Sequence, residues 1–227
     1  MLIGILQCGH FPEDLQGESG DYDAMFERLL AGENFDYATY NVVDGDFPEG
    51  PEACDVWLIT GSRHGAYEDH DWIPPLEDLI RAIRDAGRPL VGVCFGHQII
   101  AQALGGKVVK FDGGWSVGAQ TYQFEDGPVT LNAWHQDQVT ELPPGAKVIG
   151  HSDFCPFAAL HYPGRAISVQ PHPEYDDGFI KGLIDFRGRG VVPDEQLNAA
   201  TGALGTPLDR AAMAAQFAHF FKTKELA

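Results

Sequence analysis

The sequence of 227 residues contains little that would tie it to nucleic acids or membranes. It has only 15 Lys and Arg against 33 Asp and Glu, which gives a formal net charge of −18. A surface of this sign repels phosphate backbones and anionic lipid surfaces, so we expect neither a nucleic acid nor a membrane as a partner. No apolar run approaches the length of a membrane span. The apolar segment at residues 1–6 is too short for a signal peptide and predicts a first buried strand.

Cysteine is also scarce, with four residues in the whole sequence. No two of them form a Cys-x-x-Cys pair, and the dense spacing of a secreted disulfide scaffold is missing. This usage favours a reducing, cytoplasmic location and predicts no metal site. Cys8, Cys54 and Cys155 lack any setting that would activate a thiol, so we interpret them as core thiols.

Phosphate-binding machinery is absent as well. The pattern Gly-x-x-x-x-Gly-Lys-Ser/Thr does not occur, because Gly105-Gly106-Lys107 is followed by Val108. These glycines are typical of the end of a helix. We therefore expect no nucleotide-driven half-reaction and no cofactor.

The first half of the sequence alternates short apolar runs with helical patterns. Such alternation is typical of an α/β fold with consecutive crossovers. It predicts an open, mainly parallel, flavodoxin-like sheet flanked by helices. The expected strands are residues 2–8, 35–43, 55–60 and 89–93, and the expected helices are residues 21–31 and 72–86.

Beyond Gly106 the pattern changes to shorter strands separated by turn residues, which predicts an antiparallel extension of the sheet. The expected strands here are residues 107–111, 117–124, 129–134, 147–152, 157–161 and 166–170. The tail predicts a short helix near residues 179–186, an irregular stretch rich in Gly and Pro at 188–207, and a final helix at 208–224. No repeat, low-complexity tract or linker interrupts the sequence, so we expect residues 1–227 to form a single domain.

A reactive thiol is predicted at Gly92-Val-Cys94-Phe-Gly96, where an apolar strand runs into an apolar helix. Gly-x-Cys-x-Gly in this context is the cysteine form of the nucleophile elbow, a sharp turn that exposes the nucleophile above a sheet edge. The two glycines are small because the turn brings neighbouring backbones together. The partial positive charge at the start of the helix stabilises a thiolate. We therefore predict that Cys94 is a nucleophile for acyl transfer.

A cysteine nucleophile requires an imidazole as its base and a third group to orient that imidazole. The best candidates are His172 and Glu174, which lie two residues apart at the end of an apolar strand and so point to the same side. A solvated pair at a strand end, or a metal pair, would explain the same residues. His97 is closer to Cys94 in sequence, but it lies on the first turn of the elbow helix, and we interpret it as a helix residue.

Three further residues fit the surroundings of an acyl-transfer site. Gln98 lies one helical turn after Cys94, where its amide could contact a polar substrate group. The backbone N–H of Phe95 is a donor for a developing oxyanion, and Gly61, directly after a strand, is a candidate for the second donor. An exposed helix glutamine and a plain turn glycine are the alternatives for Gln98 and Gly61.

Together, Gly92-Val-Cys94-Phe-Gly96-His-Gln98 and Pro171-His172-Pro-Glu174 resemble the class I (triad) glutamine amidotransferase family. The resemblance implies a Cys94, His172 and Glu174 triad, oxyanion donors at Gly61 and Phe95, and contact between Gln98 and the glutamyl part of the substrate. It also implies that the segment Trp134-His135-Gln136-Asp137 holds the amino-acid end of glutamine, through His135 and Gln136. Thr60-Gly61-Ser62 departs from the Gly-Gly-Pro of many members, which leaves the acceptor open.

Within that family, the sequence is similar to the free-standing branch that includes γ-glutamyl peptide hydrolases. The expected activity is cysteine-dependent hydrolysis of a γ-glutamyl amide, in glutamine or a γ-glutamyl compound, through a thioester. Two alternatives remain: a glutaminase subunit that delivers ammonia to a separate synthetase, and a non-catalytic thiol sensor. The sensor alternative requires His172 and Glu174 to lie far from the sulfur.

Overall fold

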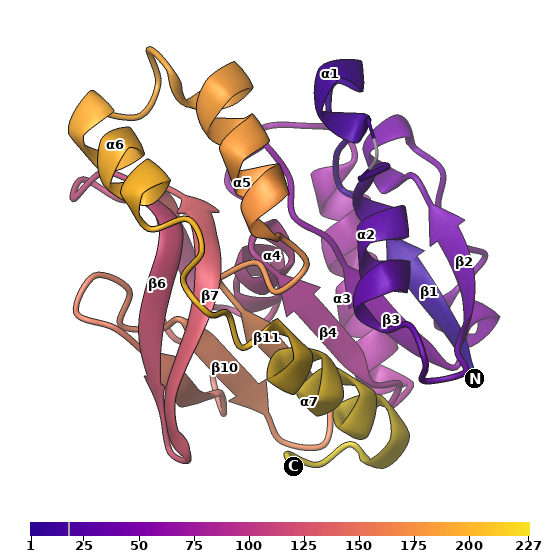
Figure 1. Cartoon of the computed structure of the whole chain (residues 1–227). Helices are drawn as coiled ribbons and strands as arrows, with labels where there is room; N and C mark the ends of the chain where they lie inside the picture. The colour runs from indigo at the N-terminus through magenta and orange to yellow at the C-terminus, as the bar shows by residue number, and fades with distance from the viewer. Residues whose placement is uncertain (18) are drawn as a thin grey trace.

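A computed structural model describes residues 1–17 and 19–227 and is built around a nine-stranded sheet with the strand order β2-β1-β3-β4-β11-β10-β9-β6-β7. Figure 1 shows how its parallel and antiparallel halves adjoin. The strands of this sheet are β1 (Leu2–Leu6), β2 (Asp36–Tyr40), β3 (Val56–Ile59), β4 (Leu90–Val93), β6 (Ser116–Phe124), β7 (Gly127–His135), β9 (Lys147–His151), β10 (Ala159–Tyr162) and β11 (Ala166–Val169).

The first half of the sheet is parallel. β1 pairs with β2 and β3, β3 pairs with β4, and β4 pairs with β11. The order β2-β1-β3-β4-β11 is that of a flavodoxin-like sheet, in which ligands bind outside the carboxyl ends of the strands. The predicted α/β class with a mainly parallel core is confirmed.

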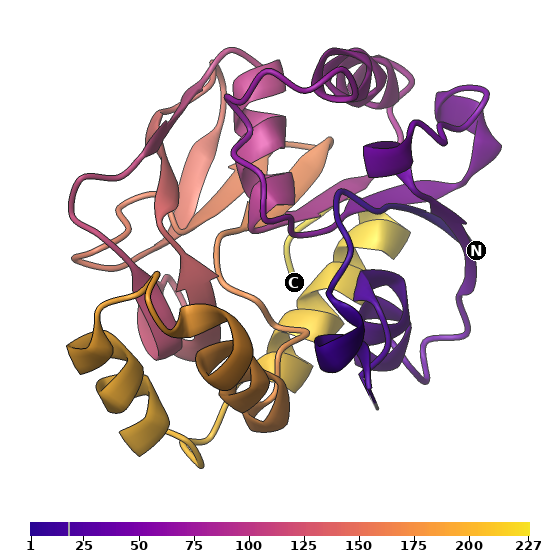
Figure 2. The same cartoon turned by 90° about the horizontal axis from the view of Figure 1, so that it is seen from above.

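Helices cover both faces of the parallel half. Figure 1 shows α2 and α7 on the near face, and Figure 2 separates them from α3 and α4 on the opposite face. None of the helices in the described part of the chain is long and apolar enough to cross a bilayer. The bounds are α2 (Tyr22–Leu29), α3 (Ile73–Asp85), α4 (Phe95–Ala103) and α7 (Arg210–Thr223).

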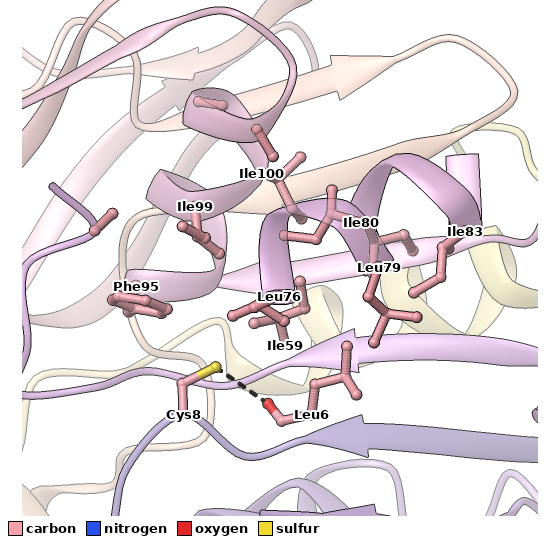
Figure 3. Close-up of a cluster of buried hydrophobic side chains, with 14 of the residues drawn as sticks. Leu6, Cys8, Ile59, Leu76, Leu79, Ile80, Ile83, Phe95, Ile99 and Ile100 are labelled. Atoms are coloured by element: carbon pink, nitrogen blue, oxygen red, sulfur yellow. Dashed lines mark hydrogen bonds between the residues drawn. The ribbon is translucent and has the colours of Figure 1, made fainter. Parts of the chain in front are cut away.

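Successive side chains of a strand point to opposite faces of the sheet, which divides the core between these two helical layers. Leu6 and Ile59 pack toward α3 and α4, whereas Ile5 and Leu58 pack toward α2 and α7. Figure 3 shows the first of these clusters, in which the thiol of Cys8 donates to the carbonyl of Leu6 at 3.5 Å. Helices on both faces bury β3 and β4 completely, whereas the edge strand β2 stays partly exposed, and the carboxyl ends of the central strands are left open for a site.

The second half of the sheet is antiparallel, as predicted, but the strands after Gly106 differ from the expectation in two ways. β11 was expected among the hairpin-like strands, yet it pairs in parallel with β4 and antiparallel with β10. The prediction omitted β8 (Asp137–Glu141), which forms a separate two-stranded sheet with β5 (Lys107–Lys110). The alternation of polar and apolar side chains in β8 is short, and no turn residue separates this strand from β7. The pattern therefore did not indicate a new strand.

The tail contains more helix than predicted. α5 (Asp177–Leu183) is followed by a π-helical turn, Ile184–Gly188, and α6 (Asp194–Gly202) lies within the stretch expected to be irregular. Gly and Pro flank α6 instead of interrupting it, because Pro193 immediately precedes its first turn. With α1 (Glu13–Gln16), these helices form a third apolar cluster, which contains Leu15, Tyr175 and Leu197.

The close packing of the elbow gives a test of the fold. A Cβ on Gly92 would lie 2.5 Å from the carbonyl oxygen of Gly96 and 2.5 Å from Cδ1 of Ile100. We expect Gly92→Ala to lower the free energy of unfolding by about 1–3 kcal/mol, measured by urea titration. Gly202→Ala is the control, since nothing lies within 4 Å of its Cβ position. Equal effects of the two substitutions would contradict the packing described here.

Candidate active site

Cys94 lies at the carboxyl end of β4 with a backbone conformation that side chains rarely adopt. Its φ is 53° and its ψ is −102°, and α4 begins at the next residue. Two hydrogen bonds hold the turn, from Cys94 N to the carbonyl of Val169 at 2.9 Å and from Gly96 N to the carbonyl of Thr60 at 3.1 Å. Strain of this kind concentrates at functional sites. The predicted elbow is therefore present in the fold.

The other three thiols are buried and free, like Cys94, but have different surroundings. Burial raises the pKa of Cys8 well above its ordinary value and raises that of Cys155 to about 12. Burial also raises the pKa of Cys54. None of these three lines the cavity described below, among the residues that the structure describes. Their surroundings fit the interpretation of core thiols.

His172 and Glu174 follow β11, which lies beside β4, so the sheet brings them to Cys94. Nδ1 of His172 is 2.6 Å from Oε1 of Glu174, and both side chains are almost completely buried. Because Nδ1 faces the carboxylate, its hydrogen is donated there, and Nε2 is the nitrogen left for the Cys94 thiol, which lines the same cavity. The three residues predicted to act together therefore lie in one contiguous group.

The charges of this group determine the protonation of the imidazole. Burial acts to lower the pKa of His172, but the negative charges of Glu174 and Cys94 and the hydrogen bonds to both raise it to about 10. An imidazolium is therefore the favoured form at neutral pH when the thiol is ionised. This arrangement places a proton donor directly beside a nucleophile.

Two residues that the sequence did not single out fix the backbone of the His172 segment. The carbonyl of Asn132 on β7 accepts from His172 N at 2.8 Å, and its side-chain amide donates to the carbonyl of Tyr175 at 3.1 Å. Arg210, the first residue of α7, donates to the carbonyls of Pro173 at 2.7 Å and Glu174 at 3.0 Å. Both contacts depend on tertiary structure, so no local pattern could have indicated them.

An aromatic ring stacks on the imidazole of His172. The ring of Tyr175 stacks on His172 with centroids 3.9 Å apart and an interplanar angle of 6°. A Cβ on Gly61 would lie 3.0 Å from Cε1 of His172 and 3.2 Å from the ring of Tyr22. Gly61 is therefore small because the imidazole occupies the space that a side chain would need.

The two predicted oxyanion donors flank Cys94. Neither the N–H of Gly61 nor that of Phe95 has an acceptor among the described residues. Phe95 directly follows the nucleophile, and its ring packs against Trp72 with centroids 5.4 Å apart. The bond from Gly96 to Thr60 joins the two segments that carry these N–H groups. Neither Gly61 nor Phe95 is among the residues that line the cavity described next.

Cys94 and His172 open into a cavity of about 610 Å³. Gln98 also lines this cavity, and its amide nitrogen donates to the carbonyl of Asp137 at 2.9 Å and to Oε1 of Gln170 at 3.1 Å. Both amide hydrogens are thus used within the protein, which leaves Oε1 of Gln98 as an acceptor for a ligand.

His135 and Gln136 line the same cavity at the end of β7. Burial lowers the pKa of His135 to about 3, so the ring is neutral. Its Nδ1 lies 3.2 Å from the carbonyl of Asp137, and its Nε2 has no partner among the described residues. Nε2 is therefore an unused acceptor. The amide of Gln136 donates to the carbonyl of Phe111 at 3.3 Å.

The remaining histidines near the site differ in their surroundings. His97 is fully buried with its Nδ1 2.9 Å from the hydroxyl of Ser168, and burial lowers its pKa to about 3. A group that could hold a metal ion, not found by sequence spacing, is formed by His64, Glu68 and His70, whose ligand atoms lie within 4.8 Å of one another. Glu68 contacts both imidazoles, at 3.5 and 2.8 Å, so these side chains already satisfy one another.

A thiol on a strained turn, an imidazole oriented by a carboxylate and backbone N–H groups without an acceptor among the described residues fit an acyl-transfer class of site. Comparison with known proteins agrees with this class. Residues 61–181 match the family model for glutamine amidotransferase class-I. The chain belongs to the class I glutamine amidotransferase family, and the resemblance stated from the sequence is confirmed.

The curated relatives include two proteins from eukaryotes. γ-Glutamyl peptidase 4 of Arabidopsis thaliana is 35% identical over 182 residues, which cover 73% of this chain and 72% of the relative. A glutamine amidotransferase-like protein of Schizosaccharomyces pombe is 27% identical over 241 residues, with 96% and 97% coverage. These relatives support an enzyme that hydrolyses γ-glutamyl amides.

Solved structures share the fold. The crystal structure of a glutamine amidotransferase from Methylobacillus flagellatus has a TM-score of 0.75 at 20% identity, and the match covers 97% of this chain and 91% of that one. A glutamine amidotransferase from Thermotoga maritima has a TM-score of 0.72 at 20% identity, with 98% and 96% coverage. At this identity the likeness concerns the fold.

The pKa of His172 gives a direct test of the site. We expect Glu174→Gln to lower it, because the substitution removes a negative charge that favours the imidazolium. NMR of the imidazole nitrogens should show wild-type His172 protonated up to a pH of about 10. Because folding raises this pKa, the stabilisation is complete below pH 6.5 and is lost as the pH rises through 10. Wild-type titration near 6.5 would contradict the charge arrangement.

Proposed function

We propose that the protein hydrolyses the γ-glutamyl amide bond of γ-glutamyl compounds through a thioester on Cys94. The observation that supports this most strongly is the buried group of Cys94, His172 and Glu174, with a strained backbone at the thiol and a 2.6 Å contact behind the imidazole. The proposal assigns a catalytic role to all three residues.

In the first half of the reaction, the Cys94 thiolate attacks the γ-carbonyl carbon of the substrate. The oxyanion that forms accepts from the N–H groups of Gly61 and Phe95, which have no other acceptor among the described residues. The carbon–nitrogen bond then breaks, and His172 transfers its Nε2 proton to the leaving amine. The products are a γ-glutamyl thioester and a free amine.

In the second half, neutral His172 removes a proton from water, which attacks the thioester carbonyl. The carbon–sulfur bond breaks, glutamate leaves, and the thiolate and imidazolium are restored. Glu174 keeps Nδ1 protonated throughout, so that Nε2 alone exchanges protons with the reacting groups. Stacking on Tyr175 restricts the ring to one plane during both steps.

The amino-acid end of the glutamyl group is proposed to bind beside Gln98, His135 and Gln136. Oε1 of Gln98 is an acceptor that the protein does not use, and it suits the α-ammonium of a glutamyl group. Nε2 of His135 also has no partner among the described residues, but the atom is buried, so its contact with a ligand requires a small shift of the cavity wall. Gln136 lies on the same cavity wall. No metal ion or cofactor enters this scheme.

A second candidate function is a glutaminase subunit that passes ammonia to a separate synthetase. The GMP synthase of Azoarcus sp. is 34% identical over 134 residues, which cover 52% of this chain and 25% of that relative. The longer matches to peptidases favour hydrolysis without a partner. Glutaminase activity that appears only with a synthetase would favour the subunit.

Removal of the thiol tests the proposed role of Cys94. We expect Cys94→Ala to reduce glutamate release from glutamine and γ-glutamyl peptides by about 10⁴-fold or more, since the covalent route is lost. Cys54→Ala is the matched control, because Cys54 is a buried thiol that does not line the cavity. Glutamate can be quantified after incubation, and circular dichroism checks the fold. No release of glutamate by the wild-type protein from any of these substrates would contradict the proposed hydrolysis.

Gly61 gives a test of the positioned imidazole. We expect Gly61→Ala to lower kcat by about 10- to 100-fold, since the added methyl displaces His172 from the thiol. Gly50→Ala is the control, because no atom lies within 4 Å of its Cβ position. Steady-state kinetics with one γ-glutamyl peptide would measure both variants. Unchanged kcat in Gly61→Ala would refute the positioning role.

A further inference from the structure

The sign of charge changes at the cavity that contains Cys94. The whole chain has 15 basic and 33 acidic side chains. Among the described residues, the cavity lining contains only two acidic side chains, Glu68 and Asp137. It contains four basic ones, which are Arg63, Lys110, Arg187 and Arg189. A strongly acidic protein therefore concentrates positive charge around the cavity, which attracts anionic ligands.

These four cations differ from several arginines elsewhere in the chain in their partners: Nε of Arg63 donates to Nε2 of His64 at 3.5 Å, and no carboxylate of a described residue holds any of the four. Among the described residues, none of the four forms an ion pair, whereas Arg81, Arg84 and Arg88 all pair with carboxylates. The two carboxylates of the lining are occupied by other groups. Glu68 contacts His70 at 2.8 Å, and Asp137 accepts from the hydroxyl of Tyr67 at 3.2 Å. The basic side chains remain available to a ligand.

Two of the four cations lie on a segment with exposed apolar side chains, residues 184–192, which we call the lip. Phe186 and Val191 are 63% and 60% exposed, the highest values for large hydrophobic side chains in the described chain, and both line the cavity. Arg187 and Arg189 lie between them. Exposed apolar and basic groups on one short segment are typical of a binding surface.

The backbone of the lip is specialised and anchored. It begins with the π-helical turn Ile184–Gly188. Such turns are rare in proteins, and those that occur are often found at functional sites. A Cβ on Gly188 would lie 2.6 Å from Leu197 and 3.1 Å from Trp134, so this residue packs against α6 and β7. The family match ends at residue 181, before the lip. The lip is therefore outside the region that carries the shared chemistry.

We propose that the lip and Lys110 form a leaving-group subsite for γ-glutamyl peptides in which the released amino acid or peptide has an apolar side chain and a free carboxylate. The inference rests on the proposed hydrolysis and specifies its substrate class. Glutamine releases only ammonia, which needs neither apolar contact nor a cation. The glutamyl α-carboxylate is a single anion, so four cations exceed what that end of the substrate requires. Phe186 and Val191 suit the side chain, and Arg187 and Arg189 suit the carboxylate.

Binding to Cys94→Ala protein tests the subsite without turnover. The ligands are γ-glutamyl-phenylalanine and γ-glutamyl-phenethylamide, which differ only in the leaving-group carboxylate. By titration calorimetry we expect the carboxylate ligand to bind at least 10-fold more tightly, and the difference to disappear when Arg187→Gln and Arg189→Gln are added together. Arg81→Gln with Arg84→Gln is the control for net charge, since it also removes two positive charges, and these arginines pair with Asp78 and Asp85 and do not line the cavity.

Turnover measurements test the subsite and the proposed hydrolysis as two separate claims. In the protein with Cys94 intact, kcat/KM for γ-glutamyl-phenylalanine should exceed that for the phenethylamide by a similar factor, and the double arginine variant should lose this preference while its rate with glutamine is unchanged. Equal binding of the two ligands, or a preference that survives the double substitution, would overturn the subsite. No turnover of any substrate, with the binding preference intact, would overturn the proposed hydrolysis and leave the subsite standing.

Discussion

The strained backbone at Cys94 is the constraint on which the site depends. A non-glycine residue with φ of 53° and ψ of −102° costs about 1–3 kcal/mol, so the surrounding structure must hold it in place. Gly92 and Gly96 have no room for a side chain, because a Cβ on either would collide with neighbouring backbone. The same turn places the thiol at the first turn of α4. Packing in the parallel core therefore determines where the nucleophile lies.

The second requirement is that an imidazole reaches this thiol from a distant segment. β11 meets it by pairing in parallel with β4, with Val169 opposite Val93, so both strands end at the same edge. The antiparallel half then supports His172 from the side, through Asn132 on β7. The two halves of the sheet thus have different tasks. The parallel half supplies the nucleophile, the antiparallel half fixes the base, and both halves contribute residues to the cavity wall.

The sequence predicted the parts of this arrangement that local chemistry encodes. The elbow, the His-x-Glu pair and the alternating strands each have a pattern that a short window contains. The parallel pairing of β11 does not, because a strand of four buried residues fits either direction. α6 was missed because Gly and Pro around it indicated irregular structure.

The supporting residues of the site were also beyond a sequence pattern. Arg210 binds the carbonyls of Pro173 and Glu174 from a helix that begins 36 residues later, and no spacing rule indicates such a contact. The role of the lip depends on which cavity its side chains line, and that depends on the packing of Gly188 against Leu197. Chemistry carried by motifs was predictable, whereas chemistry assembled by packing was not.

The thioester on Cys94 is the central claim, and product partitioning tests it most directly. Glutamine and γ-glutamyl-phenylalanine would be supplied separately with a fixed concentration of hydroxylamine, and the ratio of γ-glutamyl hydroxamate to glutamate would be measured. Once the leaving group has departed, both donors give the same γ-glutamyl thioester, so the ratio of hydroxamate to glutamate should be the same for both. A ratio that changes with the donor would show that water attacks the substrate without a shared acyl-enzyme, and would contradict the account.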